Sequence, residues 1–242
     1  MGISIRFKSD NFTSLYKSYE ELINLKNFNE IIYINCVNNN ISLIPVLPTE
    51  LQKFYCSDNH LDKLPKLPNT ITHMTCYNNN LTKLPELPES LITLSCEKNN
   101  IFSLPSLPKN LKHLYCYNNK LDVLPILPQS LRSLYCYNNY IKVLPEYINN
   151  ITYLYCNNNL LNNIPYTAKY IKIIRHKKNP IEKRLKKYFD NDIDKYLYFQ
   201  TKVLTIFVNK IENWFLEIKY NPQYKYCKNR LKKEYDELYN DY

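Results

Sequence analysis

The feature that most constrains the fold is a strict repeat of twenty residues. Seven cysteines stand at this interval, and an asparagine follows each of them three positions later. The asparagine series runs on to Asn179, where His176 takes the place of the cysteine. A constant period of this length is typical of chains that fold as stacked, similar coils, because each unit then packs only against its neighbours. The cysteines are Cys36, Cys56, Cys76, Cys96, Cys116, Cys136 and Cys156.

Each coil is predicted to contain one β-strand followed by an extended return leg. Alternation at period two points Leu114 and Cys116 inward, and it points His113, Tyr115 and Tyr117 outward. The second half of the unit reads Leu-Pro-x-Leu-Pro. Because each proline removes a backbone donor and favours extended geometry before it, the return leg should be polyproline-like rather than helical.

The complete unit, L-x-x-L-x-C-x-x-N-x-L-x-x-L-P-x-L-P, resembles the leucine-rich repeat. Its length and its L-P-x-L-P half look most like the short repeats of bacterial effectors of the YopM and IpaH type. Similar repeats occur in leucine-rich-repeat proteins of mimivirus-like giant viruses, whose AT-rich composition this chain shares. The resemblance implies an α/β solenoid with a parallel sheet on its concave face, an extended convex side and helical caps at both ends.

The repeat divides the chain into three predicted parts. These are an N-terminal cap over residues 1–30, a solenoid of seven repeats and a partial eighth over 31–181, and a helical C-terminal cap or tail over 182–242. The end coils of a solenoid need such caps because their core would otherwise be open.

At the N-terminus, residues 3–7 alternate as a short strand, and the capping-box pair Ser18 and Glu21 predicts a helix over 13–27. At the C-terminus, Asn179-Pro180 predicts a helix over 180–189. A longer amphipathic helix should follow, ending at Asn221-Pro222, and a polar helix should occupy 223–239. The apolar positions of the long helix are Ile193, Leu197, Leu204, Phe207, Ile211, Trp214 and Ile218.

The asparagine column predicts a buried ladder. Where the backbone leaves the strand, a side-chain amide can supply donors and an acceptor to buried peptide groups of its own and adjacent coils. The predicted ladder consists of Asn39, Asn59, Asn79, Asn99, Asn119, Asn139, Asn159 and Asn179.

The cysteine column favours free, buried thiols that act as small hydrophobic side chains. Side chains that point the same way on adjacent strands would form strained disulfides, and ligands in a line do not converge on one metal ion. We therefore expect neither metal nor other cofactor. Cys227 lies outside the column and is the one thiol expected to be exposed.

Catalysis has no visible apparatus in the sequence. Gly2 is the only glycine, which excludes glycine-rich phosphate loops, dinucleotide fingerprints and the nucleophile elbow. Acids on the concave face are sparse, chiefly Asp58 and Glu97, and His73 is two coils away from His113. The ubiquitin-ligase domain of the IpaH-type effectors carries a catalytic Cys-x-Asp, whereas Cys227-Lys228-Asn229 lacks the acid. We expect a protein that is not an enzyme.

Tyrosines on the concave face are the leading candidates for a binding site. Six of them occupy three consecutive strands, and tyrosine offers rigid contact area with a polar hydroxyl. The main prediction is a scaffold that binds a protein partner through this face. The predicted contacts are Tyr77, Tyr115, Tyr117, Tyr135, Tyr137, Tyr153, Tyr155 and His113.

Two alternatives stay open. The formal net charge is +10, and basic residues near the end of the solenoid could bind a nucleic acid or another acidic partner. The helical tail could instead make the chain an adaptor for a host ubiquitin or signalling enzyme. The residues proposed for an anionic partner are Lys98, Lys112, Arg132, Lys172, Arg175 and Lys177.

The unpaired cysteine pattern favours a reducing compartment, and no apolar stretch approaches the roughly 20 residues of a membrane span. We therefore expect a monomeric intracellular protein, with the cytoplasm of an infected host cell as one location.

Overall fold

The computed structural model describes residues 2–9, 12–148 and 150–218, with side chains described up to residue 211. The chain divides into two compact units, Met1–Pro180 and Ile181–Tyr242. The first unit contains the twenty-residue repeats and the second contains the C-terminal helices.

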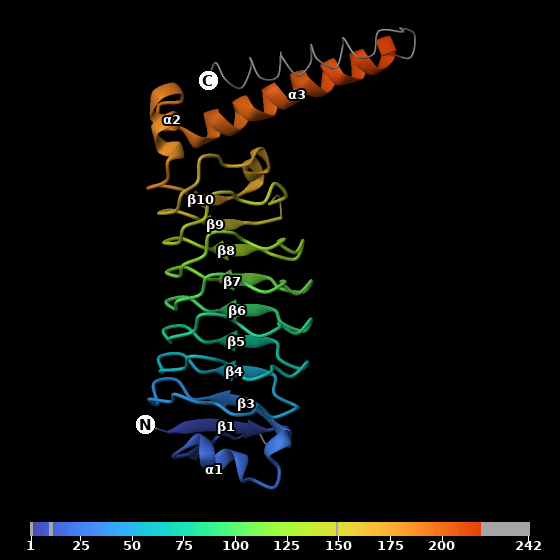
Figure 1. The fold of residues 1–242 in the computed structure, drawn as a ribbon. Helices are drawn as coiled ribbons and strands as arrows, with labels where there is room; N and C mark the ends of the chain where they lie inside the picture. The colour runs from blue at the N-terminus through green and yellow to red at the C-terminus, as the bar shows by residue number, and fades with distance from the viewer. Residues whose placement is uncertain (1, 10–11, 149, 219–242) are drawn as a thin grey trace. The chain divides into compact units, whose positions relative to one another are not determined.

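The described part of the first unit forms one ten-stranded sheet, in which β3 to β10 follow one another in chain order (Figure 1). These eight strands are parallel and paired residue for residue at steps of twenty, as in the pairing of Leu114 with Leu134. The predicted parallel solenoid is therefore confirmed. The strands are β1 (Ile3–Phe7), β2 (Ser14–Tyr16), β3 (Ile31–Asn35), β4 (Lys53–Tyr55), β5 (His73–Thr75), β6 (Thr93–Ser95), β7 (His113–Tyr115), β8 (Ser133–Tyr135), β9 (Tyr153–Tyr155) and β10 (Ile173–Arg175).

The core is a column of similar layers. In each layer from β3 to β9, the central strand residue and the following cysteine are buried, as Leu114 and Cys116 are. Hydrogen bonds between coils continue past the short strand, since the amide of Cys116 donates to the carbonyl of Tyr135. The return legs carry neither helix nor strand up to Pro165, as the prolines predict. The last leg differs, because it contains a 3-10 helix, Tyr166–Tyr170.

Each coil turns out of its strand through a residue with positive φ, between 52° and 58° along the solenoid. Glycine usually takes such a position, and asparagine and aspartate tolerate it better than other residues. In a chain with a single glycine, asparagine fills most of these sites, whereas Lys98 and Lys178 occupy two of them. The others are Asn38, Asp58, Asn78, Asn118, Asn138 and Asn158.

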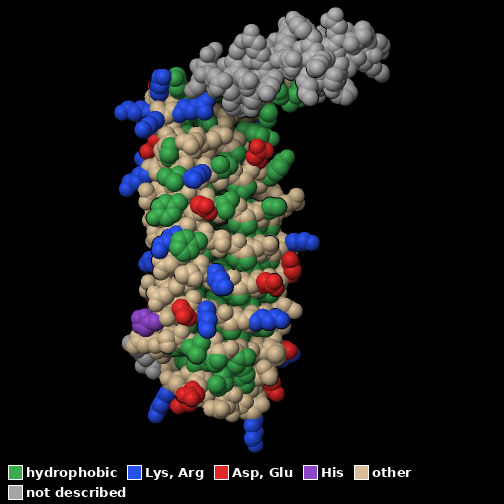
Figure 2. Space-filling view, viewed as in Figure 1, with side chains coloured by type: hydrophobic (Ala, Val, Ile, Leu, Met, Phe, Trp, Pro, Cys, Tyr) green, Lys and Arg blue, Asp and Glu red, His purple; other side chains and the backbone are tan. Residues whose placement is uncertain are grey.

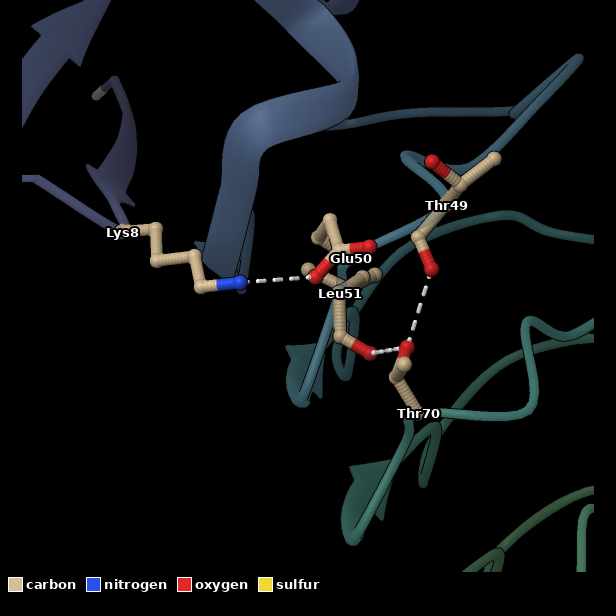
Figure 3. Close-up of polar contacts among 5 residues, drawn as sticks. All are labelled: Lys8, Thr49, Glu50, Leu51 and Thr70. Atoms are coloured by element: carbon tan, nitrogen blue, oxygen red, sulfur yellow. Dashed lines mark hydrogen bonds and ion pairs between the residues drawn. The ribbon is translucent and has the colours of Figure 1, made fainter.

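Short polar side chains also connect adjacent coils where the chain enters the strand. The hydroxyl of Thr70 donates to the carbonyl of Leu51 at 2.7 Å and to that of Thr49 at 3.0 Å (Figure 3). Beside it, Lys8 pairs with Glu50 at 3.4 Å, which ties the N-terminal strand to the next coil. Ser90 and Ser130 repeat the threonine contact in later coils.

The N-terminal cap combines two short strands with a short α-helix and a 3-10 helix, Phe28–Glu30. The predicted strand over residues 3–7 is confirmed as β1, which pairs antiparallel with β3 and covers its edge. The predicted helix over 13–27 is wrong at both ends, because α1 spans only Tyr19–Ile23 and residues before it form β2 against β1. The capping function of Ser18 is confirmed, since its hydroxyl accepts the amide of Glu21 at 3.3 Å.

The second unit contains two described helices, α2 (Ile181–Tyr188) and α3 (Ile193–Ile218), in agreement with the helices predicted over 180–189 and from Ile193 onward. Phe189 lies between them and contacts the ring of Tyr196 at 5.2 Å. The predicted helix end at Asn221-Pro222 and the helix over 223–239 lie outside the described residues. Within the described chain, no helix has both the length and the hydropathy that crossing a membrane requires.

Candidate functional site

The outward side chains of the sheet form three columns, which together make up the concave face. The first column runs from residue 33 to 173, the second from 35 to 175 and the third from 37 to 177, each at steps of twenty. The first two columns lie on the strands, and the third follows directly after them. Because the strands are in register, side chains of one column stand above one another at the strand spacing of about 4.8 Å.

The second column contains a continuous aromatic stack. The rings of Tyr115 and Tyr135 lie 4.9 Å apart at 33°, and those of Tyr135 and Tyr155 lie 4.4 Å apart at 9°. The guanidinium of Arg175 ends the stack 5.3 Å from the centre of the Tyr155 ring. Each aromatic contact of this kind stabilises by about 0.5–1.5 kcal/mol beyond the area that it buries.

The third column contains a second, shorter stack. The rings of Tyr117 and Tyr137 lie 4.3 Å apart at 9°. The Tyr117 hydroxyl donates to Glu97 at 3.5 Å, while Tyr77 interacts with Asp58 and is not part of the stack. Desolvation by burial is the main cause that raises the pKa of Tyr117 and Tyr137, so both hydroxyls stay protonated at neutral pH.

The first column is less regular. Tyr153 is exposed there, with 39% of its surface accessible. His113 Nδ1 lies 3.2 Å from the hydroxyl of Ser133 on the next strand. The structure therefore brings the predicted contact residues between 113 and 155 onto one surface. We call the six tyrosines of this surface the tyrosine block. Tyr77 lies two coils away from it. The tyrosine block consists of Tyr115, Tyr117, Tyr135, Tyr137, Tyr153 and Tyr155.

Stacking determines which part of each ring is available. In a nearly parallel pair such as Tyr135 and Tyr155, the ring faces lie against each other. Ring edges and hydroxyls therefore point away from the sheet, while the aromatic faces inside the stack are covered. The surface can offer hydrogen bonds and edge contacts in fixed positions.

Glu97 places a carboxylate inside the concave face. Its side chain accepts the hydroxyl of Ser95 at 2.7 Å in addition to that of Tyr117, and only 8% of the residue surface is accessible. Burial raises the pKa of Glu97, and the hydrogen bonds from Ser95 and Tyr117 oppose that shift. The group is a fixed acceptor at the edge of the tyrosine block.

The asparagines three residues after each cysteine connect the coils below this face. Asn79 Nδ2 donates to the carbonyls of Cys56 and Cys76 at 3.1 and 3.2 Å, and its Oδ1 accepts the amide of Leu61 at 3.0 Å. The same three contacts recur through the solenoid up to Asn179, whereas Asn39 bonds to Val37 and Gly2 instead. The other repeated positions are Asn59, Asn99, Asn119, Asn139 and Asn159.

A second row of amides runs beside the first, at the positive-φ positions. Asn78 Nδ2 donates to Asp58 at 2.6 Å, and Asn158 Nδ2 donates to Asn138 at 2.7 Å, with Asn118 next in line. Sequence reasoning missed this row. Its signal was present as the paired asparagines in five of the repeats, beginning at residues 38, 78, 118, 138 and 158.

The seven cysteines of the column are free and fully buried. Burial raises the pKa of all seven thiols, to about 12 for Cys36 and Cys156, so these thiols stay protonated. Cys227 lies outside the described residues. Within the described ranges, no group of three or more His, Cys, Asp or Glu side chains is arranged to hold a metal ion.

The six basic residues proposed for an anionic partner do not form one patch. Lys112, Arg132 and Lys172 lie directly before their strands, and Arg132 donates to the backbone carbonyl of Gln129 at 2.8 Å. Lys98, Arg175 and Lys177 lie at or beyond the opposite ends of the strands. Two of this second group, together with neighbouring residues, line a pocket at the last coil. The pocket is lined by Asn138, Asn157, Asn158, Ile174, Arg175, His176, Lys177 and Lys178.

Exposed apolar side chains on the return legs were also missed. Ile126 is 91% exposed and Tyr147 is 79% exposed, with Val123 and Val143 exposed on the same two legs. Figure 2 shows hydrophobic side chains reaching the surface among charges of both signs on the visible side. The sequence did contain this signal for Val123, Val143 and Ile126, since these residues stand where other repeats carry Lys, Glu or Ser.

Comparisons with known proteins agree on the repeat. No protein-family model and no curated protein sequence matches the chain. Among solved structures, the chain is similar to YopM from Yersinia enterocolitica WA-314, with 32% identity and a TM-score of 0.55 over 56% of this chain and 30% of that one. It is also similar to a Shigella effector leucine-rich-repeat domain, with 27% identity and a TM-score of 0.55 over 65% of this chain and 76% of that one.

The chain therefore spans less than a third of the YopM structure that it matches, and about three quarters of the Shigella domain. The link to giant-virus proteins stays a prediction. Repeat length, strand order and structural similarity agree with one another. The chain is a leucine-rich-repeat solenoid of twenty-residue repeats, similar to those of YopM and the Shigella effector.

Proposed function

We propose that the chain is a non-enzymatic scaffold that binds a protein partner on its concave face through the tyrosine block. The observation that carries this proposal is the stack from Tyr115 through Tyr135 to Tyr155, which holds three hydroxyl-bearing rings in fixed positions on the sheet. Rings that are already ordered lose little conformational freedom on binding, so more of the contact energy is retained.

A protein suits this surface better than a nucleic acid does. Single-stranded nucleic acids bind aromatic residues by stacking bases on ring faces, and the faces inside both stacks are covered by neighbouring tyrosines. The basic residues needed for phosphate contacts stand in two rows at the ends of the strands rather than within the block. Hydroxyls and ring edges, in contrast, match backbone groups and apolar side chains of a protein.

The similar Shigella structure is described as the leucine-rich-repeat domain of an effector. By this likeness, we extend the proposal to an effector-like role, in which the partner is a protein of a host cell.

The test uses the full chain. Partners captured from a host-cell extract are identified by mass spectrometry, produced in pure form, and titrated against wild type and a Tyr115→Ala/Tyr135→Ala/Tyr155→Ala variant. We expect the variant to bind at least about 30-fold more weakly, which corresponds to about 2 kcal/mol for loss of a central contact cluster. Circular dichroism checks that the variant is folded.

A matched control carries Val123→Ala, Val143→Ala and Tyr147→Ala on the return legs, where the side chains are more exposed. We expect this control to bind like wild type. If the control loses binding while the tyrosine variant keeps it, the return legs are the interface and the proposal for the concave face is wrong.

A further inference from the structure

The pocket at the last coil concentrates positive charge. It has a volume of about 320 Å³, and its lining includes Arg175, Lys177 and Lys178, with His176 between them and no acidic residue. At about 30 Å³ per water molecule, this volume corresponds to roughly ten waters. It is therefore large enough to admit a side chain together with part of its hydration shell.

A second pocket on the same edge of the sheet provides an internal comparison. It has a volume of about 430 Å³ and is lined largely by asparagines of the early coils, together with Asp58 and His60 but without lysine or arginine. Both pockets arise from the turn after the strand, so the repeat accounts for the cavity in each. The difference in charge is specific to the last coil.

The cations of the last coil are not neutralised by side chains in the described part of the chain. Arg175, Lys177 and Lys178 form no ion pair with any residue in the described ranges. Arg175 is held over the Tyr155 ring. The positive φ of Lys178, 58°, sets the backbone turn that leads from Lys177 to Asn179. Asn157 adds a side-chain amide to the lining that can donate a hydrogen bond. Three charges and an amide donor around one cavity favour an oxyanion.

We propose that this pocket binds an oxyanion carried by a side chain of the protein partner, either a carboxylate or a phosphoryl group. Arg175 belongs both to the pocket and to the end of the tyrosine stack. A partner segment that crosses the tyrosine block toward β10 therefore reaches the pocket without leaving the concave face. The identity of the ligand as part of a protein partner rests on the proposed function, whereas anion binding by the pocket does not depend on it.

The experiment measures the fluorescence anisotropy of three labelled peptides mixed with the full chain. The peptides are hexaglutamate, hexaglutamine, and a hexaglutamine in which one residue is replaced by phosphoserine. We expect the acidic and phosphorylated peptides to bind and the neutral peptide not to bind. Binding should weaken steeply between about 0.05 and 0.5 M salt, because exposed charges are screened over that range. A fourth labelled peptide, hexaglutamine with a single glutamate, is compared with the phosphorylated peptide to distinguish a carboxylate from a phosphoryl group, because hexaglutamate carries several times more charge.

The test variant is Arg175→Gln/Lys177→Gln, and the matched control is Lys63→Gln/Lys83→Gln, which removes the same charge from exposed return-leg positions. We expect at least about a tenfold loss of peptide affinity in the test variant and less than about twofold in the control. An equal loss of peptide affinity in both variants would show that binding responds to net charge alone, and it would overturn the proposal that the pocket is the binding site. Lys178→Asn offers a second variant whose turn stays favourable, and it should also weaken binding.

Two further arms separate this proposal from the proposed function. A Tyr115→Ala/Tyr135→Ala variant, which keeps the Tyr155 ring beside Arg175, should keep peptide binding even though it weakens binding of the protein partner, so each result stands alone. A labelled six-nucleotide oligothymidine should bind more weakly than the anionic peptides. Tighter binding of the oligonucleotide, with the same dependence on Arg175 and Lys177, would assign the pocket to nucleic acid and overturn the assignment to a protein side chain.

Discussion

Replacing Asn79 by alanine tests how strongly the amide ladder holds the coils together. The carbonyls of Cys56 and Cys76 would each keep a second asparagine donor from a neighbouring position of the ladder. The buried amide of Leu61, in contrast, has the Asn79 side chain as its acceptor, and alanine would leave it unsatisfied. One unsatisfied buried amide costs about 1–3 kcal/mol, so we expect Asn79→Ala to lower the free energy of unfolding by about 2 kcal/mol.

The measurement is urea unfolding followed by far-ultraviolet circular dichroism, with Asn80→Ala as the control. Asn80 lies in the same turn but is exposed, so its replacement should change stability by less than about 0.5 kcal/mol. Asn79→Asp keeps the acceptor for Leu61 but turns an oxygen toward two carbonyls, and we expect it to be at least as destabilising as alanine at pH 7. The reasoning is refuted if Asn79→Ala and Asn80→Ala unfold at the same urea concentration.

Three other outcomes are expected. A thiol reagent should modify no more than one cysteine of the native chain, Cys227, until urea exposes the rest; rapid reaction of further thiols would contradict the buried column. Lys98→Asn should stabilise by about 0.5–1 kcal/mol, because asparagine tolerates the positive φ of 53° and Lys98 interrupts the row of amides; a lower melting temperature would contradict this. The raised pKa of Glu97 means that the native state holds this proton more tightly than the unfolded state, so this group's contribution to stability falls as pH rises from its ordinary pKa through the raised one. Glu97→Gln should therefore melt above wild type at pH 8, with a smaller difference at pH 4; a difference that grows on acidification would show the opposite linkage.

The solenoid could be predicted because two independent periods coincide. Alternation at period two assigns an inward Leu114 and Cys116 to each strand, and the period of twenty then requires that successive strands pair in parallel and in register. Both the inward positions and the strand pairing can be read from the spacing of residues in the sequence, without knowledge of contacts between distant parts of the chain. The stack of Tyr115, Tyr135 and Tyr155 was placed on one face by the same two periods, although its ring geometry was not predictable.

The parts that failed depend on choices that local patterns do not fix. Ser18 and Glu21 correctly mark the beginning of α1, yet a capping pair does not say how far a helix extends, and β2 pairs with β1 instead of joining the helix. The row of amides at Asn118, Asn138 and Asn158 was missed because only the buried asparagines were assigned a function. The pocket at the last coil depends on where the stacking of similar coils ends, which the repeat itself does not specify.

The bonds of the amide ladder have a consequence for how such a chain can change its length. The contacts that Asn79 and its counterparts make between coils link residues 18 or 23 positions apart, whichever coil they begin from. Removing or duplicating one whole unit of twenty residues therefore recreates the same junction from equivalent atoms, whereas a change of nineteen or twenty-one would misalign every contact across it. A gene of this kind can gain or lose whole coils by recombination between its own repeats, and each such step would lengthen or shorten the binding surface by one strand.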